Sequence, residues 1–145
     1  MNNMKIAIGS DHAGFQLKKN IINKFKNKIH FKDVGTYSKD SVDYPDYAHL
    51  AAKELIGNKS ERAILICGSG NGIQMAANKH KNVRCALCWN KEIAELARQH
   101  NNANAISLPA RFINKDEAEK IVEAFIITKF EGGRHENRTK KINAI

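Results

Sequence analysis

Two patterns of apolar and polar residues alternate along the whole chain. Short apolar runs rich in β-branched residues predict strands, and apolar residues that recur every three or four positions predict helices. The predicted strands span residues 5–9, 29–34, 63–67, 83–87 and 104–108. The predicted helices span residues 13–26, 46–56, 91–99 and 114–129, with one more that begins within 68–80. The polar and basic segment 131–145 is expected to be partly helical.

This alternation of strands and helices is typical of an α/β fold. We expect a five-stranded parallel sheet with helices on both faces, because strands joined by helical crossovers lie parallel. Residues 63–67 form an uninterrupted apolar run, as expected of a strand covered on both sides. Asn114, followed three residues later by Glu117, predicts a capping box at the start of the last long helix. The 145 residues fit a single domain, 1–145, without a linker or internal repeat.

The sequence carries no signal for a membrane or for export. Its longest apolar run, 63–67, is far shorter than the roughly 20 residues that span a bilayer. The N-terminus lacks the apolar core of a signal peptide. The three cysteines form no disulfide framework. We therefore expect a cytoplasmic protein without a membrane partner.

Two of the cysteines, Cys85 and Cys88, form a CxxC pair. Such pairs serve in dithiol chemistry or in zinc sites, but no second pair of ligands completes a zinc site here. The pair also falls in a predicted strand, where residues three apart point to opposite faces. We therefore predict neither a redox nor a metal role for these two thiols.

The chain is basic, with 24 Lys and Arg against 15 Asp and Glu, a net charge of +9. Most of the basic residues are lysines, and they are scattered rather than gathered in a block. Nucleic-acid binding usually shows a clustered basic patch with stacking aromatics or a readable motif. We expect no nucleic-acid partner, and an anionic small substrate suits the charge equally well.

Ligands of parallel α/β sheets bind at the carboxyl ends of the strands. Two polar loops, residues 10–12 and 67–72, follow predicted strands there. In the second loop, CGSGNG, alternating glycines let the backbone approach a ligand, and the next helix offers free N–H groups. The loop thus suits a phosphate or an oxyanion, with a tight structural turn as the alternative. It matches neither the dinucleotide-binding motif nor the P-loop.

Three residues of these loops carry titratable groups, and each has two interpretations. Cys67 is either a buried small hydrophobe or a thiolate stabilised by a helix N-terminus. Asp11 is either a proton acceptor or a helix N-cap. His12 is either an anion ligand or a solvated histidine.

Further candidates lie toward the C-terminus. His100 falls at the end of a predicted helix, where a lone histidine would simply complement the helix dipole. Arg134 and Arg138 are four residues apart, so on a helix they share one face and suit a phosphate group, with a solvated basic face as the alternative. Arg111, just after the last predicted strand, is a third arginine that suits an anion.

One known family matches all of these features together. The matching stretches cover nearly the whole chain in order, at residues 9–18, 33–48, 64–86, 97–111 and 131–138. In them the chain resembles the type B ribose-5-phosphate isomerases, whose family also contains galactose-6-phosphate isomerase subunits. The resemblance implies a Rossmann-like αβα sandwich that needs no metal and no organic cofactor. It also implies a homodimer or homotetramer with sites between subunits, and a contribution of about 131–145 to the site or the dimer interface.

The family reaction interconverts D-ribose 5-phosphate and D-ribulose 5-phosphate through a cis-enediolate, in the non-oxidative pentose phosphate pathway. By resemblance, Cys67 is the base that moves a proton between C2 and C1. His100 is similarly the acid that opens the furanose ring, with Asp11 assisting. The residues that resemble donors to the enediolate oxygens are Gly68, Ser69, Gly70, Asn71, Gly72 and Asn101. Those that resemble ligands of the phosphate and hydroxyl groups are His12, Arg111, Arg134 and Arg138, and Tyr44 resembles a residue lining the sugar pocket.

The chain departs from the family pattern in one loop residue and keeps the cysteine base. Ser69, which we group with the catalytic residues, stands where many members have threonine, so the hydroxyl is kept. Some members lack the cysteine and use a glutamate near the position of Met75, whereas this chain has Cys67 and no carboxylate between residues 68 and 79. The alternatives are an isomerase of allose or galactose 6-phosphate and a non-catalytic sugar-phosphate-binding module. Cys67 and His100 occur here in one chain, which favours a homo-oligomer.

Overall fold

The computed structural model describes residues 4–145, and within them five strands form one sheet in the order β2-β1-β3-β5-β4. All neighbouring strands run parallel. The strands are β1 (Met4–Ser10), β2 (Ile29–Asp33), β3 (Arg62–Cys67), β4 (Cys85–Leu87) and β5 (Ala105–Pro109). The helices are α1 (Phe15–Phe25), α2 (Tyr44–Ile56), α3 (Asn71–Ala77), α4 (Lys91–Asn101), α5 (Lys115–Ile127) and α6 (Arg134–Asn143). The predicted α/β class with a five-stranded parallel sheet is confirmed.

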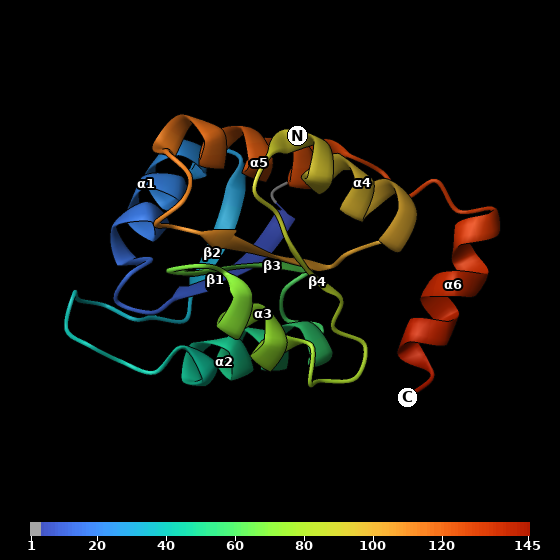
Figure 1. Ribbon diagram of the computed structural model, residues 1–145, viewed down its shortest axis with the longest axis horizontal. Helices are drawn as coiled ribbons and strands as arrows, with labels where there is room; N and C mark the ends of the chain where they lie inside the picture. Colours follow the sequence, from blue (N-terminus) through green and yellow to red (C-terminus); the bar gives the residue numbers. More distant parts are fainter. Residues whose placement is uncertain (1–3) are drawn as a thin grey trace.

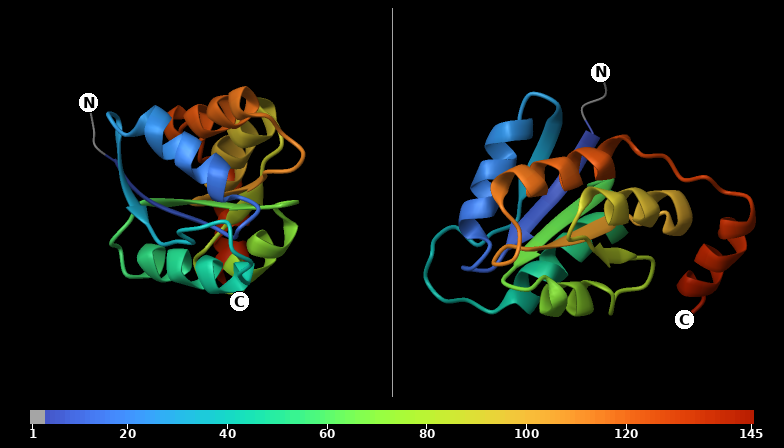
Figure 2. Two further views of the ribbon diagram at one scale, coloured as in Figure 1. Left: turned by 90° about the vertical axis from the view of Figure 1, so that its left-hand side faces the viewer. Right: turned by 45° about the horizontal axis from the view of Figure 1, so that its top comes forward.

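The sheet lies between two layers of helices (Figures 1 and 2). α1, α4 and α5 cover one face, and α2 and α3 cover the other. The alternation of side chains in β1 serves both layers: Ile6 and Ile8 join the core under α1 and α5, and Ala7 between them packs with α2. α6 stands outside both layers, at one end of the molecule beside α4 (Figure 1).

Some element boundaries differ from the prediction by a residue or two. α2 begins at Tyr44, earlier than predicted, because Pro45 fits the first turn of a helix. β4 begins only at Cys85, since this strand lies at the edge of the sheet and has β5 as its single neighbour. Asn114 and Glu117 form the predicted capping box at the start of α5.

Two opposite edges of the sheet matter for the site. Ala63 pairs with Ala105 and Cys67 pairs with Pro109, so β3 and β5 begin together and end together. Their four residue steps, at about 3.3 Å each, separate the amino edge from the carboxyl edge by roughly 13 Å. In Figure 1 the connection 34–43 lies at the left-hand end of the molecule and α6 at the right-hand end. No helix among residues 4–145 has both the length and the apolar character needed to cross a bilayer.

Candidate active site

Cys67 is the last residue of β3, and its side chain lies at the carboxyl edge of the sheet. It is only 4% exposed. The segment after β5 is hydrogen-bonded to it and to the next residue: the Ala110 N–H donates to the Cys67 carbonyl at 2.9 Å, and the Arg111 N–H donates to the Gly68 carbonyl at 3.0 Å. The thiol and the first glycine of the loop are therefore held by backbone bonds, and Arg111 is brought beside them.

Each glycine of loop 67–72 is required by a different local constraint. Gly70 has a φ of +78°, a left-handed conformation that favours glycine. A Cβ on Gly72 would lie 2.7 Å from Tyr44 Oη, so the absence of a side chain there admits the Tyr44 ring. A Cβ on Gly68 would lie 3.0 Å from Nη1 of Arg111. Packing thus explains much of the glycine pattern, and it brings Tyr44 and Arg111 to the loop.

Asp11 and His12 lie at the same edge, next to the end of β3. The Asp11 N–H donates to the Ile66 carbonyl at 3.2 Å, and Asp11 Oδ1 accepts the Gly14 N–H at 3.1 Å. The carboxylate therefore makes a capping bond just before α1, although Gly14 is the N-cap residue. Asp11 is 6% exposed, so this polar side chain is buried beside the strand end that carries Cys67.

His12 is fixed by the long connection between β2 and α2. Its Nδ1 accepts the Val42 N–H at 3.2 Å, which leaves Nε2 as the nitrogen for a ligand. His12 is therefore a half-buried histidine whose ring is oriented by one backbone bond.

Lys18, which the sequence analysis did not single out, anchors the start of that connection. Its side chain is 1% exposed, and its Nζ lies 2.6 Å from Asp33 Oδ1 and 2.5 Å from the Thr36 carbonyl. The same Asp33 oxygen accepts the Gly35 N–H at 2.9 Å. The only hint of this role in the sequence was the spacing of Lys18, three positions before Ile21, which places both residues on the buried face of α1.

A second group of predicted residues lies at the amino edge of the sheet. His100 belongs to the last turn of α4 and Asn101 ends that helix. The Glu131 N–H donates to the Gln99 carbonyl at 3.1 Å and so joins the start of the C-terminal segment to α4. The exposed Arg134 and Arg138 then share α6, as their spacing predicted.

The predicted site residues therefore divide into two groups within one chain. The carboxyl-edge group is Asp11, His12, Tyr44, Cys67, Gly68, Ser69, Gly70, Asn71, Gly72 and Arg111. The amino-edge group is His100, Asn101, Arg134 and Arg138. Because the length of β5 separates the two groups, one chain alone does not bring Cys67 and His100 together.

The six arginines also divide into two kinds. Arg62, Arg84 and Arg98 donate to backbone carbonyls inside the fold, as in the bonds from Arg98 to the Thr128 and Ala103 carbonyls at 3.0 and 2.8 Å. Burial, together with smaller contributions from the nearby Arg62 and Arg84, lowers the pKa of Arg98 to about 10. The exposed arginines that remain are the ones predicted to bind phosphate, namely Arg111, Arg134 and Arg138.

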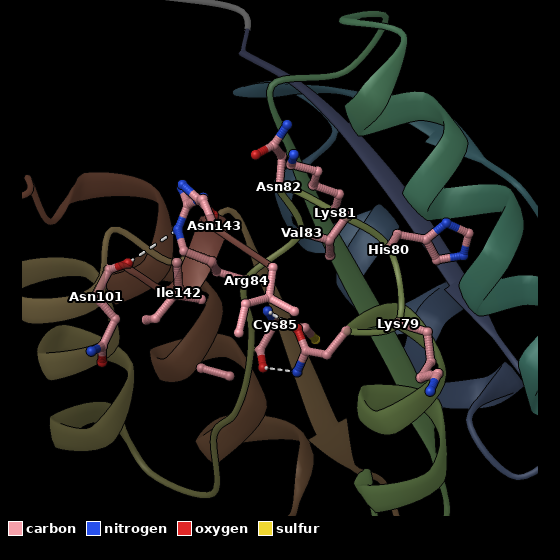
Figure 3. Close-up of a pocket in the computed structure, with 14 residues that line it drawn as sticks. Lys79, His80, Lys81, Asn82, Val83, Arg84, Cys85, Asn101, Ile142 and Asn143 are labelled. Carbon is pink, nitrogen blue, oxygen red and sulfur yellow. Dashed lines mark hydrogen bonds between the residues drawn. The ribbon is translucent and has the colours of Figure 1, made fainter. Parts of the chain in front are cut away.

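A hollow of about 300 Å³ lies between the approach to β4 and α6 (Figure 3). Its lining includes Lys79, Lys81, Arg84 and Ile142, and Arg84 donates to the Asn101 carbonyl at its rim. Of the predicted site residues, only Asn101 borders it. The hollow is thus separate from the Cys67 group at the carboxyl edge.

Cys85 and Cys88 do not form a working pair. Cys85 packs in the core beneath α2 and α3, and Cys88 packs in the core on the other side of the sheet, as the strand spacing predicted. Burial raises the pKa of both thiols, that of Cys88 to about 12. Both therefore stay protonated at neutral pH.

The described residues contain one cluster of three groups that a metal ion commonly uses: His100, Glu131 and His135, whose ligand atoms lie within 4.8 Å of one another. The rings of His100 and His135 are stacked, however, with only 14° between their planes. Nitrogen lone pairs lie in the ring plane, so those of stacked rings run side by side and do not converge on one point. As placed, the cluster is a histidine stack rather than a metal cage.

Comparison with known proteins places this geometry in context. Residues 6–142 match the family described as Ribose/Galactose Isomerase. Ribose-5-phosphate isomerase B of Escherichia coli is 40% identical over 142 residues, which cover 97% of this chain and 95% of that protein. A ribose 5-phosphate isomerase structure from Thermotoga maritima has a TM-score of 0.97 at 47% identity and covers 99% of this chain and 100% of its own. The Mycoplasma genitalium enzyme, solved with bound ribulose-5-phosphate, has a TM-score of 0.93 at 44% identity, with 99% and 96% covered.

Proposed function

The chain belongs to the ribose/galactose isomerase family, and from this premise we propose that it interconverts D-ribose 5-phosphate and D-ribulose 5-phosphate. It is an aldose-ketose isomerase of the ribose-5-phosphate type. The observation that carries the choice of substrate is the similarity over nearly the full length to a structure that holds ribulose-5-phosphate. The proposed setting is the cytoplasmic, non-oxidative pentose phosphate pathway.

The carboxyl-edge group supplies the proton transfer. Isomerisation removes a proton from the carbon next to a carbonyl and returns it to the neighbouring carbon, so a base and donors for the developing oxyanion must lie together. Cys67 acts as the base between C2 and C1. The N–H groups of the loop Gly68–Gly72 donate to the enediolate oxygens, with Ser69 supporting the loop through its bond from the Asn71 N–H at 3.3 Å.

The second group supplies ring opening and part of the phosphate grip. His100 gives a proton to the ring oxygen as the bond from this oxygen to C1 breaks, and Asp11 takes the proton of the C1 hydroxyl. Asn101 adds an amide donor to the enediolate. Arg134 and Arg138 bind the phosphate, together with His12 and Arg111 from the first group, so that remote binding holds the reacting carbons in place.

The proposal requires two copies of the chain at each site. Cys67 and His100 lie at opposite edges of one sheet, so we place the Cys67 group of one subunit against the His100 group of another. A homodimer supplies two such sites, and a homotetramer is a pair of these dimers. Segment 131–145, which stands outside the helical layers, then reaches the site of the neighbouring subunit.

A coupled assay of the purified protein tests the function. D-ribose 5-phosphate and D-allose 6-phosphate are offered in parallel, each with and without EDTA, and Cys67→Ser serves as the matched inactive variant. We expect rapid turnover of the pentose, little of the hexose, and no effect of EDTA. Preference for the hexose would replace the pentose assignment, and wild-type protein without turnover of either sugar would overturn the isomerase proposal for these substrates.

A further inference from the structure

His100 does not stand alone at the end of α4, because the ring of His135 is stacked on it. The ring centroids lie 4.3 Å apart and the planes differ by 14°. His135 comes from the first turn of α6 and is 6% exposed, although its neighbours Arg134 and Glu136 are exposed. A buried polar ring in an otherwise exposed helical turn is placed there by a specific contact.

Glu131 contacts both of the helices that carry the stack. On the His135 side, Glu131 Oε1 lies 3.7 Å from Nε2 of the ring. Glu131 is in turn tied to α4 by its backbone bond to the Gln99 carbonyl, next to His100. The histidine pair therefore joins the end of α4 to the beginning of α6 and closes a short link between the two helices.

The charges around the pair favour a neutral His135. Burial lowers the pKa of His135, and the nearby His100, Arg134 and Arg138 lower it too, while Glu131 opposes them. A neutral ring can lie flat against a second imidazole whether or not the latter carries a proton. A charged His135 would instead repel a protonated His100 at this distance.

We propose that His135 is a positioning residue, which holds the His100 ring in the orientation for ring opening and couples it to the helix that carries the phosphate-binding arginines. This proposal rests on the proposed function, since it assigns His135 to the acid of that reaction. His135 itself need not touch the reacting carbons. Its stack restricts rotation of the His100 ring, which otherwise ends a helix with solvent on one side.

Three variants test this role. His135→Ala removes the stacking ring, and His135→Phe keeps a flat aromatic surface without the polar nitrogens. His80→Ala is the control, because His80 also contacts another histidine, His49, with ring centroids 4.9 Å apart, but belongs neither to the His100–His135 stack nor to the predicted site residues. We expect His135→Ala to lower kcat for D-ribose 5-phosphate about ten- to hundredfold, a fraction of what a general acid contributes. KM changes less than threefold, and His135→Phe regains most of the rate.

A second readout separates positioning from damage to the fold. D-ribulose 5-phosphate has no furanose ring to open, because its C5 oxygen carries the phosphate. Exchange of its C1 proton with D2O, followed by NMR, therefore reports on Cys67 without the ring-opening step. We expect this exchange to stay within about threefold of wild type in His135→Ala. The pH profile of kcat for ribose 5-phosphate should also shift in this variant and return in His135→Phe.

The results that overturn the proposal are distinct from those that overturn the function. Equal losses of ribose turnover and of proton exchange in His135→Ala would indicate a merely structural residue. A raised KM with unchanged kcat would make His135 a phosphate ligand instead, and unchanged kinetics in His135→Ala would remove any role. Failure of the wild-type protein to isomerise either pentose phosphate would instead refute the proposed function.

Discussion

The ring of Tyr44 occupies the space that a side chain at residue 72 would need, since a Cβ on Gly72 would lie 2.7 Å from Tyr44 Oη. Tyr44 is the first residue of α2, and Gly72 lies in the first turn of α3. Tyr44 and the glycine-rich loop are therefore fitted to each other. Tyr44 is 39% exposed, so its ring remains accessible to a ligand.

Gly72→Ala should disturb the loop by displacing Tyr44. We expect a loss of about 1–3 kcal/mol in unfolding free energy, the usual cost of overpacking, and at least tenfold lower kcat/KM. Chemical denaturation and the isomerase assay measure the two effects. Tyr44→Ala combined with Gly72→Ala should recover stability, because the clash is gone, but not activity. A Gly72→Ala variant as stable and active as wild type would contradict this fit.

Lys18 is expected to control the connection that carries Val42 and thereby His12. Lys18→Met leaves the Asp33 carboxylate and the Thr36 carbonyl without their shared partner. Removing one member of a buried pair costs about 3–5 kcal/mol, and because Asp33 is 35% exposed we expect about 2 kcal/mol. KM for the sugar phosphate should rise more than kcat falls.

The neighbouring Lys19 provides the control for that experiment. It is exposed and also lies near the Phe15 ring, at 5.5 Å from the ring centroid, but it has no buried carboxylate partner. Lys19→Met should leave stability and KM within experimental error of wild type. Equal effects of the two substitutions on stability and KM would show that the loss of a positive charge explains them, and that the buried pair of Lys18 and Asp33 does not.

The Cys88 thiol should make the fold sensitive to high pH. Its pKa is raised from 9.0 to about 12 by burial, so between these values the unfolded chain loses a proton that the folded chain keeps. Stability is then fully present below about pH 9 and falls as pH rises toward 12, by at most about 1.4 kcal/mol per pH unit.

Comparison with Cys88→Ala isolates this contribution from other groups that titrate at high pH. Under reducing conditions, the loss of unfolding free energy between pH 7 and pH 10 should be smaller in Cys88→Ala by about 1 kcal/mol. Urea denaturation at the two pH values measures the difference. Identical losses in both proteins would show that Cys88 does not titrate in the unfolded chain as assumed.

The features that could be predicted from the sequence are those that depend on residues close together in the chain. The capping box at Asn114, the opposite faces of Cys85 and Cys88, and the shared helix of Arg134 and Arg138 each depend on spacing within one element. The presence of two strand-end loops followed from the alternation of strands and helices. These features need no knowledge of how the elements pack.

The remaining features depend on tertiary contacts between distant residues. Lys18 sits on a helix and Asp33 on a strand, and nothing local pairs them. The insertion of β5 between β3 and β4 is one of several orders that right-handed crossovers allow. The stack of His135 on His100 depends on how the segment after α5 returns to α4, which no periodicity encodes.

Cys67→Ser should lower kcat by about a thousandfold or more, because an alcohol is a far weaker base than a thiolate, with KM changed little. Cys85→Ala is the matched control and should keep its turnover. Iodoacetamide should inactivate the wild type by labelling Cys67 alone, since burial keeps Cys85 and Cys88 protonated. Substrate should slow this inactivation. Normal turnover of Cys67→Ser would exclude the cysteine as base.

The separation of Cys67 from His100 in one chain predicts that inactive subunits complement each other. A heterodimer of one Cys67→Ser subunit and one His100→Asn subunit contains one site with both defects and one site with neither, if each site takes these residues from different chains. Purified through two different affinity tags, it should have about half of the wild-type activity, although both parent homodimers are nearly inactive. If each chain instead carried a complete site, every site of the heterodimer would keep one defect. Activity no higher than that of the parents would therefore refute the shared site and leave the position of His100 at the opposite edge without a catalytic purpose.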